Sequence, residues 1–154
     1  MKIIVTGGAG FVGSHLTEFL VSKKHFPIIV DNLNSGLYSN IKKFVDSKKA
    51  KFIKCDIRNF KKLMKIPKVD AVIHLAAIAS VVESIQNPIF VNDVNVNGTM
   101  NILEFCRNKK IKKLVFTSSA AIYGDYDKKI TEISPTIPTT VYGSTKLTGE
   151  QYCK

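Results

Sequence analysis

Short apolar runs alternate along the chain with stretches whose apolar residues recur at helical spacing. Branched apolar residues predict buried strands over 2–6, 27–30, 52–56, 71–75 and 113–117. Helical spacing predicts helices from Phe11, over 88–108 and from Tyr142. This alternation predicts an α/β fold, a doubly wound parallel sheet with helices on both faces. No repeat or linker divides the sequence, so we expect one domain over 1–154.

A glycine-rich loop lies between the first predicted strand and the first helix. Gly7, Gly10 and Gly13 give the spacing Gly-x-x-Gly-x-x-Gly. Residues without Cβ permit a tight turn, let backbone N–H groups approach a pyrophosphate at the helix N-terminus, and allow the helix to pack closely. Any tight strand-to-helix turn favours glycine, but the position of this loop after a buried N-terminal strand favours dinucleotide binding. The helix that follows is predicted to be amphipathic, with apolar positions at Phe11, Val12, His15, Leu16, Phe19 and Leu20.

An acidic residue ends the second predicted strand. A carboxylate at Asp31, 18 positions after Gly13, can accept both hydrogen bonds of an adenosine ribose diol and would repel a 2′-phosphate. This predicts NAD rather than NADP as the ligand. The alternative is a turn-forming role, because the pair Asp31-Asn32 is of a kind that favours turns.

The last predicted helix opens with the pattern Tyr-x-x-x-Lys. Tyr142 and Lys146 are four residues apart, so they share one helix face and can point into one cleft. The ammonium and the charge of an oxidised nicotinamide both favour a phenolate, which makes tyrosine a usable proton acceptor near neutral pH. The Tyr-x-x-x-Lys pattern often occurs by chance, so it indicates this chemistry only in combination with the other motifs.

One polar residue interrupts an apolar helical stripe. Val91, Asn95, Gly98, Ile102 and Phe105 fall on one face of the helix predicted over 88–108. A polar group in such a stripe needs a partner. Either a contact with a cofactor or a hydrogen bond to a neighbouring helix would supply the partner that Asn95 needs.

Composition narrows the class of protein. A chain of 154 residues, 45% of them hydrophobic, suits one globular domain and excludes a disordered chain. The longest apolar stretch, 71–82, is too short to span a membrane, and the N-terminal apolar run is shorter than a secretory signal requires. We therefore expect a cytoplasmic protein. Its 3 cysteines lack metal-ligand spacing and are expected to be free thiols.

Two further residues have ordinary structural interpretations. His74 interrupts a predicted strand and is interpreted as a core histidine with a hydrogen-bond partner. Cys55, at a strand end, is interpreted as a small buried hydrophobic residue.

The charge balance is strongly basic, with 23 Lys and Arg against 12 Asp and Glu and a net charge of +11. Only Arg58 and Arg107 are arginines, and the lysines are scattered in pairs. A nucleic-acid binder concentrates charge on one face and uses arginine to read base edges. We therefore expect a solvated lysine surface without a specific nucleic-acid partner. The surplus charge would also help to attract a phosphorylated ligand.

These motifs together resemble a known family. The matching segments occur in family order over nearly the whole chain: 6–16, 30–33, 55–58, 74–77, 95–99, 117–124 and 142–146. The chain is identified as a member of the extended short-chain dehydrogenase/reductases, in the NAD-dependent sugar-nucleotide epimerase/dehydratase family, and resembles its UDP-glucose 4-epimerase type. The resemblance implies a Rossmann-type sheet, NAD as cofactor, a UDP-hexose as substrate and a homodimer of the full-length protein. Family members are about twice as long, so it also implies an NAD-binding portion whose substrate domain is absent.

The resemblance also implies roles for individual residues. Ser119 would hydrogen-bond the reacting sugar hydroxyl, Tyr142 would be the acid/base, and Lys146 would hold the nicotinamide ribose. Starting at the pyrophosphate and passing through the adenosine ribose and adenine to the nicotinamide, the implied cofactor-binding residues are Gly7, Gly10, Phe11, Val12, Gly13, Asp31, Asn32, Asp56, Ile57, Leu75, Ala76, Ala77, Ala79, Asn95, Thr117, Tyr142 and Lys146.

The residues after Ser119 bear on the type of reaction. Ala120 and Ala121 stand where sugar dehydratases of the family carry an Asp-Glu pair. Alanine cannot transfer a proton, so the resemblance favours C4 epimerisation of a nucleotide sugar through a 4-keto intermediate over 4,6-dehydration. A dehydratase, a reductase, a decarboxylase and a non-catalytic NAD-binding module stay open as alternatives.

Overall fold

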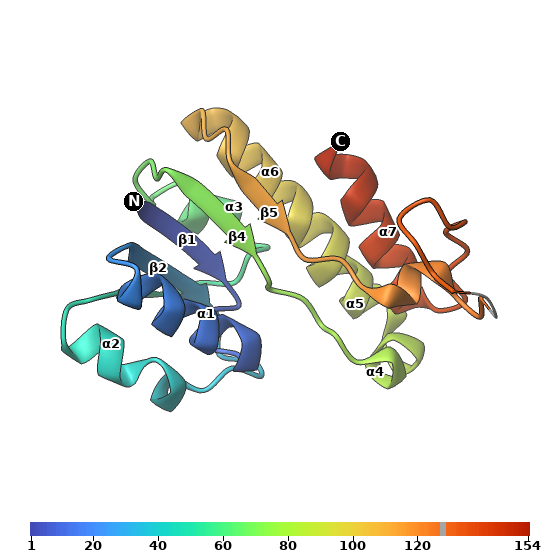
Figure 1. Cartoon of the computed structure of the whole chain (residues 1–154), viewed down its shortest axis with the longest axis horizontal. Helices are drawn as coiled ribbons and strands as arrows, with labels where there is room; N and C mark the ends of the chain where they lie inside the picture. Colours follow the sequence, from blue (N-terminus) through green and yellow to red (C-terminus); the bar gives the residue numbers. More distant parts are fainter. Residues whose placement is uncertain (127–128) are drawn as a thin grey trace. The chain divides into compact units, whose positions relative to one another are not determined.

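The computed structural model describes residues 1–126 and 129–154, which form two compact units. The first, unit 1, comprises residues 1–76 and 101–115, and the second, unit 2, comprises 77–100 and 116–154. Figure 1 shows all of their elements in sequence colours. A single domain over 1–154 stays a prediction.

Unit 1 is built around the parallel sheet. Its elements are β1 (Lys2–Thr6), α1 (Phe11–Ser22), β2 (Phe26–Asp31), the 3₁₀ turn η1 (Tyr38–Asn40), α2 (Lys42–Asp46), β3 (Lys51–Lys54), α3 (Phe60–Leu63), β4 (Ala71–His74), most of α6 (Gly98–Lys109) and most of β5 (Leu114–Phe116). The strand order is β3-β2-β1-β4-β5, with β1 parallel to both β2 and β4. This order is typical of the doubly wound fold, and the predicted fold class is confirmed.

The central strand shows why this sequence forms a buried parallel sheet. In β1 every residue after Lys2 is buried, and Ile4 lies opposite Ile28 of β2 and Val72 of β4. On one face, Ile3 and Val5 pack with Leu20 of α1. Helix α1 lies in front of the sheet in Figure 1, while α6 is partly hidden behind β5. Because helices cover both faces of the sheet, the apolar side chains of β1 are removed from water on both sides, which favours a continuous apolar strand.

The buried face of α1 differs from the predicted one. Phe11, Val12 and Phe19 are 80%, 61% and 55% exposed, and the buried residues are instead Gly13, Ser14, Thr17 and Leu20. At the start of α1 the reason is steric, because the helix lies too close to the glycine loop for a side chain at position 13. A Cβ on Gly13 would lie 2.3 Å from the carbonyl oxygen of Gly7.

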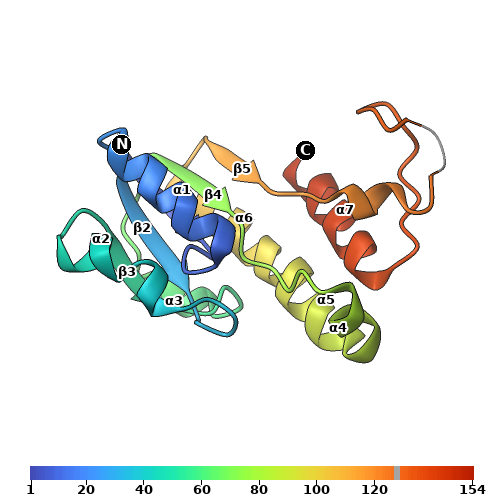
Figure 2. The same cartoon turned by 60° about the horizontal axis from the view of Figure 1, so that its bottom comes forward.

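Unit 2 is mainly helical. Its elements are α4 (Val81–Gln86), α5 (Pro88–Asn92), the π-helical segment η2 (Asp93–Asn97), the first residues of α6, the 3₁₀ turn η3 (Ala120–Tyr123) and α7 (Val141–Cys153). Figure 2 shows α4 and α5 from a second side. The helix predicted over 88–108 is confirmed as a helical path from α5 to α6, with one π-helical turn inside it. Among the described residues, no helix is long and apolar enough to cross a membrane.

Candidate functional site

The glycine loop of unit 1 has the geometry of an anion site. Gly7 has φ +67°, and a Cβ there would lie 2.8 Å from the backbone nitrogen of Ala76. Gly10 caps α1 without a side-chain hydrogen bond, and the first turn of α1 contains no acidic residue. The first-turn N–H groups of a helix have no intrahelical acceptor, so they can donate to a phosphate. Phe11 and Val12, at the start of α1, are exposed beside them.

Asp31 ties the end of β2 to this loop. Its Oδ2 accepts from Ala9 N at 3.0 Å and its Oδ1 from Leu33 N at 2.8 Å, and the residue is 8% exposed. The bond to Leu33 confirms the turn-forming interpretation. Each carboxylate oxygen has a second lone pair, so the same side chain can also accept hydrogen bonds from two ribose hydroxyls.

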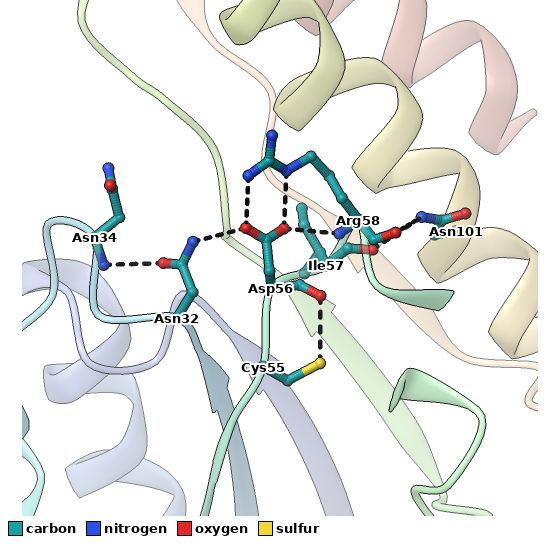
Figure 3. A network of polar contacts seen from close by, with 7 residues as sticks. All are labelled: Asn32, Asn34, Cys55, Asp56, Ile57, Arg58 and Asn101. Carbon is teal, nitrogen blue, oxygen red and sulfur yellow. Dashed lines mark hydrogen bonds and ion pairs between the residues drawn. The ribbon is translucent and has the colours of Figure 1, made fainter. Parts of the chain in front are cut away.

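A polar network surrounds Asp56, as Figure 3 shows. Asp56 Oδ1 accepts from Arg58 N at 2.9 Å and Arg58 Nε at 3.0 Å, and Oδ2 accepts from Arg58 Nη2 at 2.8 Å and Asn32 Nδ2 at 3.0 Å. The Arg58 guanidinium lowers the pKa of Asp56 to about 2, because its hydrogen bonds favour the ionised carboxylate more than partial burial disfavours it. Ile57 is buried beside this pair. Asn32 and Asp56 are therefore brought together, although they are 24 residues apart.

Thr6 joins the carboxyl ends of β1 and β4 within unit 1. Its fully buried hydroxyl accepts from Leu75 N and Ala76 N, both at 3.1 Å, and lies 2.6 Å from His74 Nδ1. The two N–H groups fill the acceptor positions of Oγ1, so its proton goes to Nδ1 and His74 carries its own proton on Nε2. His74 is thus a core histidine with a partner, as predicted. Thr6 was not among the predicted site residues, because nothing local marks it.

In unit 2, η3 and α7 lie close together around Ser119 and Tyr142. The Ser119 hydroxyl accepts from Ala121 N at 3.2 Å and caps η3. Gly143, next to Tyr142, is buried, and a Cβ there would lie 2.4 Å from the carbonyl oxygen of Ala121. Glycine at 143 therefore permits the close approach of the turn that carries Ser119 to the helix that carries Tyr142.

Lys146 is buried one turn after Tyr142. It is 5% exposed, and its Nζ lies 4.5 Å from the ring centroid of Phe116. Burial lowers the pKa of Lys146 to about 8, because removal from water disfavours the charged form. A Cβ at Gly149 would lie 2.4 Å from the Phe116 ring, so Gly149 leaves room for it. Neither Phe116 nor Gly149 was predicted from the sequence.

Asn95 lies inside the π-helical segment η2, is 3% exposed and has protein partners at both ends of its amide. Its Oδ1 accepts from Ile78 N at 2.8 Å, and its Nδ2 donates to the Ile78 carbonyl at 3.1 Å and to Thr145 Oγ1 at 3.0 Å. The packing alternative is therefore the one the structure supports. Asn95 holds the 77–80 segment and α7 in place within unit 2.

The remaining predicted residues and cysteines lie as follows. Leu75, Ala76 and Ala77 are half-buried, whereas Ala79 and Thr117 are exposed. Cys55 and Cys106 are buried, Cys153 is exposed, and none of the three forms a disulfide. Within residues 1–126 and 129–154, no cluster of His, Cys, Asp and Glu could hold a metal ion. A separate pocket of about 560 Å³ contains none of the predicted site residues and is lined by Gln86, Asn87, Pro88, Ile89, Phe90, Asn92, Asp93 and Asn97.

Comparison with known proteins gives a consistent result. The model of the NAD dependent epimerase/dehydratase family matches residues 3–154. The chain belongs to this family. The predicted resemblance is thereby confirmed, and so is the prediction of NAD as the cofactor, because this family is NAD-dependent and related structures have been solved with NAD bound.

Relatives in the epimerase/dehydratase family show how much of a full protein this chain covers. It is 42% identical to a putative UDP-glucose 4-epimerase of Methanocaldococcus jannaschii, over 99% of this chain and 50% of that protein. The UDP-Glc/GlcNAc 4-epimerase of Campylobacter jejuni matches with a TM-score of 0.94 at 34% identity, over 98% of this chain and 47% of that one. The UDP-glucose 4-epimerase of Bifidobacterium longum, solved in complex with NAD+ and UDP, matches with a TM-score of 0.93 at 33% identity, over 99% and 48%. The chain thus spans about half the length of these relatives.

Proposed function

We propose that the full-length parent of this chain is an NAD-dependent epimerase that inverts C4 of a UDP-linked hexose through a 4-keto intermediate. The observation that carries the proposal is the close packing of η3 on α7 at Gly143, which brings together the elements bearing Ser119 and Tyr142. Similarity to 4-epimerases over nearly the whole chain supports it. Ala120 and Ala121 favour epimerisation over dehydration, because neither can serve as the additional acid or base.

The residues of unit 1 fit NAD. The glycine loop offers the open start of α1 to a pyrophosphate, and Asp31 keeps free lone pairs for the ribose diol. We assign the adenosine end to Asn32, Asp56 and Ile57. The full proposed set, with the contacts assigned by resemblance, is Gly7, Gly10, Phe11, Val12, Gly13, Asp31, Asn32, Asp56, Ile57, Leu75, Ala76, Ala77, Ala79, Thr117, Tyr142 and Lys146.

Unit 2 supplies the proton chemistry. When bound, NAD would supply the hydride acceptor and donor for C4 of the sugar. Tyr142 takes the proton of the C4 hydroxyl and later gives it back, and Ser119 hydrogen-bonds the same oxygen. Lys146, with a pKa of about 8, is mostly protonated at pH 7, and we assign it to hold the nicotinamide ribose.

The test uses the full-length parent with UDP-glucose, UDP-galactose, their N-acetyl and uronate forms, and dTDP-glucose. We expect interconversion of a 4-epimer pair and its loss in Tyr142→Phe, with Tyr152→Phe, an exposed tyrosine of the same helix, as the matched control. A 4-keto-6-deoxy product, or unchanged turnover in Tyr142→Phe, would overturn the proposal.

We further propose that the parent forms a homodimer and works in the cytoplasm. Exposed apolar side chains at Val82, Ile85 and Ile89 of α4 and α5 supply surface for association. Cys55 and Cys106 are not joined in disulfides, which suits a reducing compartment. Light scattering on the full-length protein tests the first statement, and a monomer at micromolar concentration would contradict it.

A further inference from the structure

The carboxylate of Asp56 has little capacity left for a ligand. A carboxylate offers about four acceptor positions. Three of them accept from Arg58, through its backbone nitrogen, Nε and Nη2, and the fourth accepts from the side-chain amide of Asn32. A ligand that binds Asp56 must therefore replace one of these donors.

The three Arg58 bonds are the ones that stay. They form between residues two apart, and the guanidinium grips the carboxylate as a fork through Nε and Nη2. Asn101 Nδ2 donates to the carbonyl oxygens of both Ile57 and Arg58 at 3.0 Å, which holds this backbone in place within unit 1. Figure 3 shows the fork and these anchors together.

The Asn32 bond is the exchangeable one. Asn32 is exposed, follows β2 and lies 24 residues from Asp56, so no local geometry compels this contact. Its donor is a planar NH₂ group on an sp² carbon. The 6-amino group of adenine is a planar donor of the same kind, whereas the 6-oxo group of hypoxanthine is an acceptor and would face the carboxylate without a proton.

We propose that Arg58 is a positioning residue for adenine recognition. It orients Asp56 so that a single acceptor position, held by Asn32 in the free chain, receives the exocyclic amine of the dinucleotide. This inference rests on the proposed NAD binding of unit 1 and goes beyond it by naming the residue that makes the site selective for the base. Arg58 itself need not touch the ligand.

The experiment compares NAD with nicotinamide hypoxanthine dinucleotide, which differs at the 6-position of the base. Dissociation constants for both are measured by calorimetry on the wild-type chain and on Arg58→Met, Arg58→Lys and Arg107→Met. Arg107 is the matched control, because it forms an ion pair with Glu104 on an exposed face of α6 at 2.6 Å, against 2.8 Å for Arg58 and Asp56. Lysine at position 58 keeps the charge but cannot form the fork.

We expect the wild type to bind NAD about tenfold more tightly than the hypoxanthine analogue, since a site built for a donor rejects a ligand that lacks it. The ratio should fall to about threefold or less in Arg58→Met, lie below the wild-type value in Arg58→Lys and stay unchanged in Arg107→Met. The ratio is the decisive readout, because a merely structural loss would weaken both ligands equally.

Two results would overturn the inference. The first is equal affinity of the wild type for the two dinucleotides, which needs no variant to fold. The second is a wild-type affinity ratio in Arg58→Met, whether both ligands bind that variant as well as the wild type or are equally weakened. Failure of the wild type to bind either dinucleotide would instead refute the proposed NAD site, and the role of Arg58 with it.

Discussion

Replacing Thr6 by valine tests how the carboxyl ends of β1 and β4 are joined. Valine keeps the shape of threonine and removes the hydroxyl that contacts Leu75 N, Ala76 N and His74 Nδ1. Leu75 N also donates to the carbonyl oxygen of Thr6 at 3.2 Å, so it keeps an acceptor. Ala76 N and His74 Nδ1 lose their hydrogen bond to the Thr6 hydroxyl.

The expected cost follows from these two groups. Loss of a hydrogen bond costs about 1–3 kcal/mol at the buried His74 and less at the half-buried Ala76, so Thr6→Val should lower the free energy of unfolding by about 2–4 kcal/mol. That is a large part of the roughly 5–15 kcal/mol typical of a domain. Thr6→Ser is the matched control, because it keeps the hydroxyl and loses one methyl group, worth about 1 kcal/mol.

Urea unfolding followed by circular dichroism measures both variants by linear extrapolation. The slope of free energy against urea must be equal in the three proteins for the comparison to hold. If Thr6→Val proves as stable as Thr6→Ser, the hydroxyl does not carry the energy assigned to it, and the account of this strand junction is wrong.

Asp31, Lys146 and Val115 each carry a further prediction. Asp31 should make the chain bind NAD at least about tenfold more tightly than NADP, because the carboxylate repels a 2′-phosphate; equal dissociation constants would refute this. Burial lowers the folded-state pKa of Lys146 to about 8, so the unfolded chain binds more protons than the folded chain between about pH 8 and 10.5. The free energy of unfolding of the wild type, relative to that of Lys146→Met, should therefore rise with pH over that window. If urea unfolding shows the same difference between the two proteins at every pH, this prediction is wrong. Val115, 58% exposed on the edge strand β5, should promote self-association at micromolar concentration, and light scattering should show that Val115→Lys reduces it; a wild-type monomer would disprove this.

The main elements could be predicted from local pattern alone. The strand predicted over 2–6 coincides with β1, and α7 begins one residue before the predicted Tyr142. The short helices α2 and α3 were missed, because five and four residues are too few to show a period. Helix α3 is instead marked by a cap, in which Asn59 accepts from Lys62 N.

The sequence by itself determined the chemistry that depends on neighbours along the chain. The spacing of Gly7, Gly10 and Gly13 specifies a tight strand-to-helix turn, and four-residue spacing places Tyr142 and Lys146 on one helix face. Both motifs can be recognised from residue spacing alone, because turn and helix geometry are local properties of the chain.

Only the tertiary structure decided which distant groups these motifs meet. Thr6 reaches Ala76 across 70 residues, Asn32 reaches Asp56 across 24, and the ammonium of Lys146 lies over the ring of Phe116. Such contacts depend on strand order and on how closely glycines let backbones approach, and neither is encoded in the spacing of the residues themselves. Helix α1 shows the same limit, because its apolar spacing alone does not reveal that Phe11 and Phe19 are exposed or that Gly13 must lie against the glycine loop.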